Sequence, residues 1–362
     1  MEIKVTKTTH PKEKPDQNHL PFGRIFTDHM FTMDYDAGKG WHNAQIEPYG
    51  PITLEPSACV FHYAQEVFEG LKAYKTPDGH VQMFRPTENL ARMNRSNKRM
   101  CIPEIDEAFV LDALKRLVAL DQDWIPTAPG TALYIRPFVF ATEEYIGVHV
   151  SNRYKFFIIL CPVGAYYEEG LKPAMMHIEQ VYARTVVGGT GEAKCGGNYA
   201  GSLAATEKAN AEGYEETLWL DGATRKNIEE VGSCNVMFRI DGKFVTPKLT
   251  GTILPGITRK SIIELLKSWG ETVEERILPI EELVADYHAG KVEEVFGMGT
   301  AAVVAPIGKL NYNGEDMVFN DDQIGPYAQK IYDTLCGIQR GIVEDSFGWV
   351  EKVPAGDRKS VV

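Results

Sequence analysis

An unusual glycine-rich stretch surrounds one lysine in the middle of the chain, Gly188-Gly189-Thr190-Gly191-Glu192-Ala193-Lys194-Cys195-Gly196-Gly197-Asn198-Tyr199. A phosphate-binding P-loop requires Gly, four residues, Gly, Lys and then Ser or Thr. Counted from Gly188, Ala193 takes the place of the second glycine and Cys195 that of the hydroxyl residue, so a P-loop is excluded. Two interpretations remain. The stretch is a surface loop with an exposed lysine, or its small residues let a planar ligand approach a lysine whose partly deprotonated amine forms a Schiff base with a carbonyl.

Two adjacent glutamates, Glu229 and Glu230, lie farther along the chain and directly precede Val231-Gly232-Ser233. A lone glutamate beside a strand is most often a solvated charge. Together with a distant Schiff-base lysine it has a second interpretation, because pyridoxal phosphate (PLP) needs an anion opposite its ring nitrogen to remain a protonated electron sink.

Two turns of small residues and two arginines could bind anions. Leu254-Pro255-Gly256-Ile257-Thr258 opens a predicted helix, and the N–H groups of a helix N-terminus bind phosphate. Gly297-Met298-Gly299-Thr300-Ala301-Ala302 offers a similar turn after a predicted strand. Arg85 and Arg136 each have aromatic residues nearby, and arginine binds phosphate or carboxylate bidentately. For each feature alone, an ordinary turn or a surface arginine is the more common explanation.

The chain around these segments is organised as two mixed α/β domains. Its 362 residues fit two domains of about 100–200 residues each. Apolar residues at helical spacing predict helices over residues 108–120, 258–269 and 326–342. Short apolar and β-branched runs predict strands over residues 155–162, 216–220, 233–240, 243–246 and 294–297. The first twenty or so residues lack apolar periodicity, so we expect an arm, with order beginning near Pro21.

The composition and net charge of the chain argue against nucleic acids and membranes as its binding partners. The chain is 44% hydrophobic and 24% charged, which is ordinary for a globular protein. Its net charge of −12 gives no global electrostatic reason to bind nucleic acid or an anionic membrane. No apolar run is long enough to span a bilayer, and residues 1–22 lack the apolar segment of a secretory signal. We therefore expect a soluble, cytoplasmic protein whose partners are small molecules or a second copy of itself.

Cysteine and histidine spacing gives no metal or redox motif. The six cysteines are scattered without a Cys-x-x-Cys pair, and the nine histidines have no ligand spacing. We expect free, mostly buried thiols and no bound metal.

Further segments follow the same order as those of a known family. They are Phe22-Gly23-Arg24, Phe68-Glu69-Gly70-Leu71-Lys72, Phe84-Arg85-Pro86, Tyr134-Ile135-Arg136-Pro137, Cys161-Pro162-Val163-Gly164-Ala165-Tyr166, Lys194 to Tyr199, Glu230-Val231-Gly232, Leu254-Pro255-Gly256 and Gly299-Thr300. Together they resemble the branched-chain amino acid aminotransferases, which are fold-type IV PLP enzymes. The resemblance implies an α/β (α+β) fold of two domains with PLP at their interface. Its parts are a flexible arm (residues 1–20), a small N-terminal α/β domain (21–164), a linker (165–176) and a large PLP-binding domain (177–362) with a mixed, barrel-like sheet.

The resemblance also implies roles for individual residues. Lys194 matches the Schiff-base lysine, which also moves the proton at the substrate α-carbon. Glu230 matches the partner of the pyridinium nitrogen, and Tyr199 matches the residue hydrogen-bonded to the phenolic oxygen of PLP. The residues that match the phosphate-binding group are Arg85, Ile257, Thr258 and Thr300, with Arg184 as a further arginine nearby.

The matching substrate pocket has apolar walls with one arginine at the rim. Its predicted walls are Phe22, Tyr63, Phe68, Tyr134, Tyr166 and Ser233. The amides of Ala301 and Ala302 match the turn that binds the α-carboxylate, and Arg136 matches the arginine that takes the distal carboxylate of glutamate. One pocket can then accept an aliphatic side chain and a carboxylate in alternate half-reactions.

Three positions depart from the family pattern. Met237 stands where Phe or Tyr is usual, and Ser233 stands where this form of the enzyme commonly has Thr. Ala302 and Ala305 occupy the places of a Cys-x-x-Cys redox pair found in some eukaryotic members, so we expect no thiol control of that kind.

The function implied by the resemblance is a ping-pong transamination between L-leucine, L-isoleucine or L-valine and 2-oxoglutarate by a PLP-dependent homodimer. Two alternatives stay open at this stage. One is another fold-type IV enzyme, a D-amino acid transaminase or an aminodeoxychorismate lyase. The other is a non-catalytic binding protein that has kept the fold.

Overall fold

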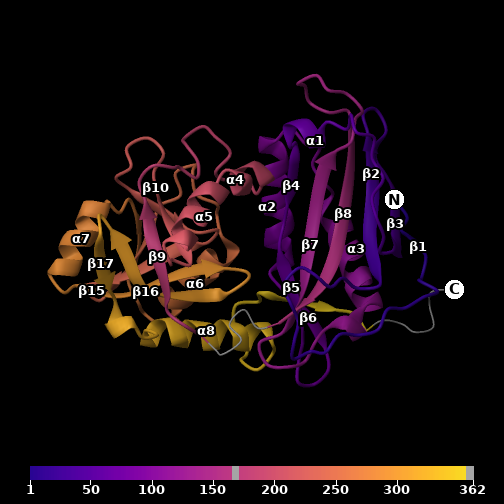
Figure 1. The fold of residues 1–362 in the computed structure, drawn as a ribbon. Coiled ribbons are helices and arrows are strands. Elements are labelled where there is room, and N and C mark those ends of the chain that lie inside the picture. Colours follow the sequence, from indigo (N-terminus) through magenta and orange to yellow (C-terminus); the bar gives the residue numbers. More distant parts are fainter. Residues whose placement is uncertain (165–170, 356–362) are drawn as a thin grey trace. The chain divides into compact units, whose positions relative to one another are not determined.

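The computed structural model describes residues 1–164 and 171–355, and the chain divides into two compact units (Figure 1). The first unit comprises Met1–Glu168, Ala193–Gly196 and Gly337–Val362, and the second comprises Glu169–Glu192 and Gly197–Cys336. Lys194 thus belongs to the first unit with Ala193, Cys195 and Gly196, whereas the chain up to Glu192 and from Gly197 belongs to the second. The domain limits expected from the sequence stay a prediction, and residues 165–170 of the expected linker lie outside the described residues.

The first unit is built on a nine-stranded sheet in the order β1-β3-β2-β8-β7-β5-β6-β18, with β4 paired to β7. Its strands are β1 (Lys4–Val5), β2 (His29–Asp36), β3 (Gly40–Pro48), β4 (Glu66–Phe68), β5 (Leu71–Lys75), β6 (Val81–Phe84), β7 (Ala132–Ala141), β8 (Arg153–Val163) and β18 (Val350–Val353). Its helices are α1 (Val60–Tyr63), α2 (Pro86–Arg99), α3 (Glu107–Leu120) and the short 3-10 helix η1 (Gln122–Trp124).

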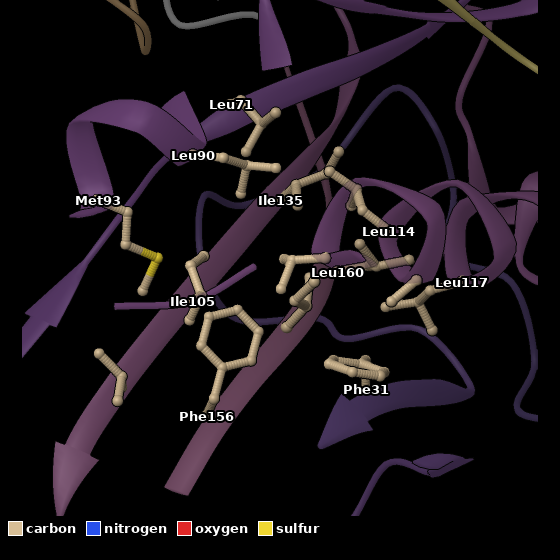
Figure 2. Packing of buried hydrophobic residues seen from close by; sticks show 14 of the residues in the cluster. Phe31, Leu71, Leu90, Met93, Ile105, Leu114, Leu117, Ile135, Phe156 and Leu160 are labelled. Atoms are coloured by element: carbon tan, nitrogen blue, oxygen red, sulfur yellow. The ribbon is translucent and has the colours of Figure 1, made fainter. Parts of the chain in front are cut away.

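Helix α3 forms because its apolar residues fall on one stripe and its first turn is capped. The Asp106 carboxylate accepts the N–H of Phe109 at 3.0 Å. Figure 2 shows Leu114 and Leu117 of α3 among Phe31, Phe156 and Leu160 of the sheet, and Leu90 and Met93 of α2 belong to the same core. The helix predicted over residues 108–120 is therefore confirmed.

The first twenty residues differ from the expected flexible arm. Ile3 is buried in the core of the first unit, and the strand β1 pairs in parallel with β3. Farther along, the N–H of Lys12 donates to Asp28 Oδ1 at 2.8 Å. A strand of two residues is too short to show an apolar periodicity. Its order depends on pairing with a strand that is distant in sequence, which the local sequence does not reveal.

The second unit contains another nine-stranded sheet, in the order β11-β10-β9-β16-β15-β12-β13-β14, with β17 paired to β16. Its strands are β9 (Ala174–Glu179), β10 (Glu216–Leu220), β11 (Ile228–Val231), β12 (Asn235–Ile240), β13 (Lys243–Pro247), β14 (Val273–Arg276), β15 (Val292–Gly299), β16 (Val303–Tyr312) and β17 (Glu315–Val318). The helices assigned from Gly196 onward are α4 (Gly196–Ala200), α5 (Leu203–Ala211), α6 (Ile257–Ser268), α7 (Ile280–His288), η2 (Asn320–Asp322) and α8 (Pro326–Gln339).

A tight turn makes this second sheet curl. The N–H of Val231 donates to the carbonyl of Cys234 at 2.9 Å, and the N–H of Cys234 returns a bond of 2.8 Å. Gly232, with φ of 54°, stands at the first central position of this two-residue turn, where left-handed backbone is required. The turn brings β11, at one end of the strand order, beside β12, which stands nearer the other end. The barrel-like sheet expected from the sequence is confirmed.

Most elements predicted from periodicity are present. Strand β10 has the predicted bounds, and α6 lies within one residue of its prediction at each end. Helix α8 ends at Gln339, shortly before the Gly341 whose φ of 69° is unfavourable for other residues. Within residues 1–164 and 171–355, no helix combines the length and apolar character needed to cross a membrane.

We predict that the core of the first unit tolerates little loss of volume. Ile158 on β8 is fully buried, so Ile158→Ala should lower the free energy of unfolding by about 2–5 kcal/mol. Ile342 in the same unit is 68% exposed, and Ile342→Ala should change the free energy by less than about 0.5 kcal/mol. Urea denaturation followed by circular dichroism measures both. Equal losses in the two variants would contradict the assigned core.

Candidate active site

The backbone around Lys194 is anchored to two elements of the first unit. The N–H of Lys194 donates to Ser96 Oγ of α2 at 2.9 Å. Its carbonyl accepts the N–H of Phe68 on β4 at 3.0 Å, and the N–H of Gly196 donates to the Glu66 carboxylate of the same strand. Three bonds therefore hold this short segment, and Lys194 is only partly exposed, so the interpretation as a surface loop with an exposed lysine is wrong.

The surroundings of Lys194 favour its neutral amine. The Nζ atom lies 4.8 Å from the centroid of the Phe68 ring. Burial lowers the pKa of the Lys194 amine to about 8, Arg92 and Arg136 act in the same direction, and Glu69 and Tyr134 oppose it. With that pKa about one amine in ten is neutral at pH 7, compared with about one in three thousand for an ordinary lysine. The amine is therefore available as a nucleophile near neutral pH.

Four of the predicted pocket residues lie together near this lysine. The Arg136 guanidinium carbon lies 4.7 Å from the Phe68 ring centroid and 5.4 Å from that of Tyr134. Arg136 Nη2 donates to the Tyr134 hydroxyl at 3.1 Å, and the Phe22 ring meets the Tyr134 ring edge-on at 5.0 Å. Arg136 Nε is buried and has no hydrogen-bond acceptor among the described residues. The cluster thus combines aromatic walls with a donor that an anionic ligand group could satisfy.

Three other predicted residues of this half have different surroundings. The Tyr63 hydroxyl donates to the carbonyl of Ile146. Arg85 has a φ of 48° at the start of α2, and its buried guanidinium lies 3.4 Å from Glu88 and 5.2 Å from the centroid of the Trp349 ring. Tyr166 lies outside the described residues.

In the second unit, Glu230 is a buried carboxylate held by one ion pair and one hydrogen bond. Arg184 Nη1 lies 2.7 Å from Glu230 Oε2, and Asn235 Nδ2 donates to Oε1 at 3.0 Å. Arg184 also donates to the carbonyl of Thr252 at 3.0 Å. The arginine predicted as a further cofactor-binding residue therefore ion-pairs with the glutamate predicted to meet the ring nitrogen, which favours an ionised carboxylate there.

The same asparagine connects Glu230 to the N-terminus of α6. Asn235 Nδ2 also donates to the carbonyl of Leu254 at 3.0 Å. A Cβ on Gly256 would lie 2.0 Å from Asn235 Oδ1, so glycine is needed there for this close approach. The N–H of Lys260 donates to the carbonyl of Gly256 at the start of α6. The N–H groups of Ile257 and Thr258 lie before this bond, in the first turn of the helix, where N–H groups have no acceptor within the helix. Such groups, with the helix dipole behind them, can bind a phosphate.

The turn of Thr300, Ala301 and Ala302 joins β15 to β16 and carries backbone strain. Val303, which follows it, has a φ of 64°, although a β-branched residue disfavours that region by about 1–3 kcal/mol. The N–H of Val304 donates to the carbonyl of Ala302 at 2.8 Å. Strain of this kind is typical of ligand-binding turns.

The remaining predicted residues of the second unit lie on or next to short elements. Ser233 is exposed in the turn between β11 and β12, and Tyr199 lies on α4. Met237 is buried on β12, as expected for a residue that only repacks a strand.

Several polar residues that organise these groups were missed by sequence reasoning. They are Glu69, Asn89, Arg92, Asn235 and Thr252. Glu69 was part of a quoted segment but received no role, because sequence alone does not show that it is fully buried. The run Val67-Phe68-Glu69-Gly70-Leu71 is apolar except for Glu69, and a charged residue in such a run is the signal that could have singled it out.

Comparisons with known proteins agree on one family. The family described as amino-transferase class IV matches residues 66–310. The branched-chain-amino-acid aminotransferase 2 of Bacillus subtilis is 54% identical over 98% of this chain and 97% of that protein. The crystal structure of the Escherichia coli branched-chain amino acid aminotransferase superimposes with a TM-score of 0.75 at 26% identity, over 90% of this chain and 99% of that one. The T.th. branched-chain amino acid aminotransferase with pyridoxamine 5'-phosphate has a TM-score of 0.74 at 26% identity, over 89% and 98%.

Proposed function

The chain belongs to the class IV aminotransferases, and from that premise we propose that it transfers the amino group between L-leucine, L-isoleucine or L-valine and 2-oxoglutarate in a PLP-dependent, ping-pong reaction. The observation that carries the proposal is the anchored Lys194 with its amine of lowered pKa. An amine that is partly neutral near pH 7 can bond covalently to the carbonyl of a cofactor or ketone.

The residues present fit PLP. When bound, PLP supplies an electron sink for the electron pair left at the substrate α-carbon. Lys194 Nζ would hold the cofactor and then move a proton to and from the α-carbon. Glu230, kept anionic by Arg184 and Asn235, would hold the proton on the ring nitrogen. The N–H groups of Ile257 and Thr258, with Arg85 and Thr300, would bind the phosphate, and Tyr199 the phenolic oxygen.

The aromatic cluster around Arg136 suits two kinds of substrate. Phe22, Phe68 and Tyr134 supply apolar surface for an aliphatic side chain. The guanidinium of Arg136, including its buried Nε, supplies donors for the distal carboxylate of glutamate. Ala301 and Ala302 would hold the α-carboxylate through their amides, while Tyr63, Tyr166 and Ser233 would complete the walls of the pocket.

We expect the purified protein reconstituted with PLP to be yellow and to convert to the pyridoxamine spectrum when L-leucine is added. Lys194→Ala should bind little PLP covalently and lose turnover, whereas Lys75→Ala, at an exposed position outside the proposed machinery, should retain turnover. Absorption spectra and a coupled assay with 2-oxoglutarate measure both effects. A protein that stays colourless with excess PLP, or that reacts with D-leucine instead of L-leucine, would refute the proposal.

Arg136→Met should affect the two half-reactions unequally. Methionine preserves an apolar wall, but it removes charge-assisted hydrogen bonds worth about 1.5–3 kcal/mol to a substrate carboxylate. The half-reaction with glutamate should therefore slow by about ten- to a hundredfold more than the half-reaction with leucine. Stopped-flow measurement of each half-reaction tests this. Equal losses would mean that Arg136 shapes the site without recognising the distal carboxylate.

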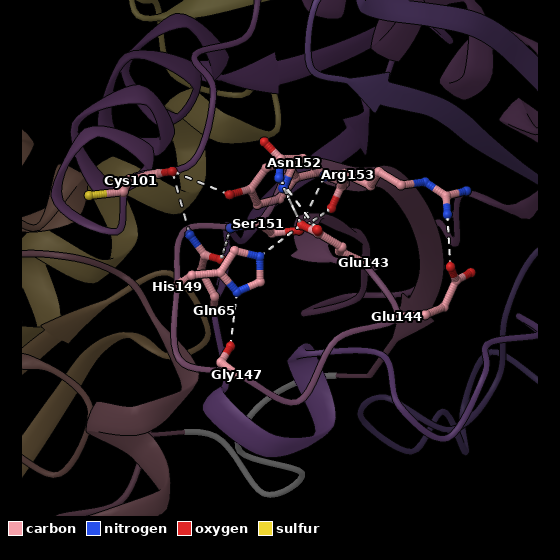
Figure 3. Close-up of polar contacts among 10 residues, drawn as sticks. Gln65, Cys101, Glu143, Glu144, Gly147, His149, Ser151, Asn152 and Arg153 are labelled. Carbon is pink, nitrogen blue, oxygen red and sulfur yellow. Dashed lines mark hydrogen bonds and ion pairs between the residues drawn. The ribbon is translucent and has the colours of Figure 1, made fainter.

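The proposal includes a homodimer, supported by an exposed apolar loop in the first unit. The loop between β7 and β8 carries Ile146 and Val148, which are 66% and 84% exposed. Figure 3 shows how polar contacts shape this loop, and the Glu143 carboxylate accepts the N–H of Asn152 at 2.6 Å and lies 3.0 Å from His149 Nε2. Apolar side chains that a fixed loop presents to water are typical of an interface.

Sedimentation equilibrium tests the dimer. The wild-type chain should sediment as a dimer, and Val148→Asp should weaken the association by at least about tenfold because it would bury an unpaired charge in the interface. Val187→Asp, at a site of the second unit that is 77% exposed, is the control and should leave the association unchanged. A monomeric wild-type protein would refute this part of the proposal. A cytoplasmic location also belongs to the proposal, and cell fractionation measures it.

A further inference from the structure

A buried ion pair lies beside the anchored lysine in the first unit. Glu69 is fully buried, and Arg92 binds both of its oxygens, Nε to Oε1 and Nη2 to Oε2, each at 2.8 Å. Asn89 Nδ2 adds a bond of 2.8 Å to Oε2. Burial alone would raise the pKa of the Glu69 carboxyl, but Arg92, Lys194 and Asn89 together hold it below its ordinary value.

Both members of this pair are tied to the backbone of Lys194. Ser96, which accepts the N–H of Lys194, follows Arg92 by four residues on α2 and therefore shares its face of the helix. Phe68, whose N–H donates to the carbonyl of Lys194, directly precedes Glu69. The position of the lysine and the position of the ion pair are thus set by the same two elements.

We propose that Arg92 and Glu69 are positioning residues that set the protonation state of the Lys194 amine. Arg92 engages both carboxylate oxygens, so that Glu69 neutralises the guanidinium first and acts on the lysine only at reduced strength. This inference rests on the proposed role of Lys194 as the cofactor-binding lysine.

The electrostatics around the amine follow from the groups that face it. Arg92 from α2 and Arg136 from β7 favour the neutral amine, while Glu69 after β4 and Tyr134 on β7 favour the ammonium. Removing Arg92 alone would leave Glu69 to stabilise the ammonium at full strength. Removing Glu69 alone would leave Arg92 uncompensated and would favour the neutral amine further. The two single changes therefore act in opposite directions, which a merely structural ion pair would not produce.

The test is the pH dependence of Lys194 acetylation in the full chain freed of cofactor, measured by competitive labelling with acetic anhydride and mass spectrometry. The labelling midpoint of the wild-type protein should lie near pH 8. Arg92→Met should raise it, and Glu69→Gln should lower it, each by about one pH unit. The double variant Glu69→Gln/Arg92→Met should raise the midpoint above the wild-type value, but by less than Arg92→Met alone, because Arg92 acts on the amine more strongly than Glu69. Arg92→Lys, which keeps the charge, should shift the midpoint less than Arg92→Met.

The folding of each variant is checked separately from its labelling midpoint, because breaking a buried ion pair often destabilises a protein. Circular dichroism identifies variants that fold. Arg92→Gln keeps one hydrogen bond to Glu69 and replaces Arg92→Met if that variant does not fold, with the same expected direction. Unchanged or parallel midpoints in the folded single variants would overturn the inference. The proposed function is tested independently by the leucine-dependent spectrum of the wild-type protein, so either proposal can fail alone.

Discussion

The chemistry proposed for this chain depends on keeping one partly buried amine partly uncharged. Burial disfavours the ammonium of Lys194, and the guanidinium groups of Arg92 and Arg136 repel it. The backbone of Lys194 is held by hydrogen bonds to Ser96 and Phe68. The first unit therefore combines a hydrogen-bonded lysine backbone with charged groups that lower the pKa of its amine.

In the second unit the opposite arrangement is present, because the contacts of the buried Glu230 carboxylate favour its charged form. Arg184 and Asn235 both bind Glu230, and each also binds a backbone carbonyl, of Thr252 and of Leu254. These shared partners connect the carboxylate to the N-terminus of α6. The carboxylate that we propose for the ring nitrogen and the amides that we propose for the phosphate are thereby connected by one network of polar contacts, so a single substitution in it would disturb both.

Local sequence patterns predicted many elements because those elements carry their own signals. Helix α3 has an apolar stripe and a capping aspartate, and β10 is a short run of buried residues. The first strand had no such signal, since the two residues of β1 are ordered only by pairing with β3. The same limitation applies to Glu69, Asn89 and Arg92, whose residue types are unremarkable until the fold buries them together.

The sequence by itself determined the family, the lysine and glutamate expected to act on PLP, and the apolar character of the residues around Arg136. Those conclusions rest on the order of short segments along the chain, which can be read from the sequence without any interatomic distance. Only the tertiary structure decided that Arg184 pairs with Glu230, that Arg136 Nε is buried without an acceptor among the described residues, and that Arg92 binds both oxygens of Glu69. Protonation states depend on burial and on charges a few ångströms away, and residues distant in the sequence create both only when the chain has folded.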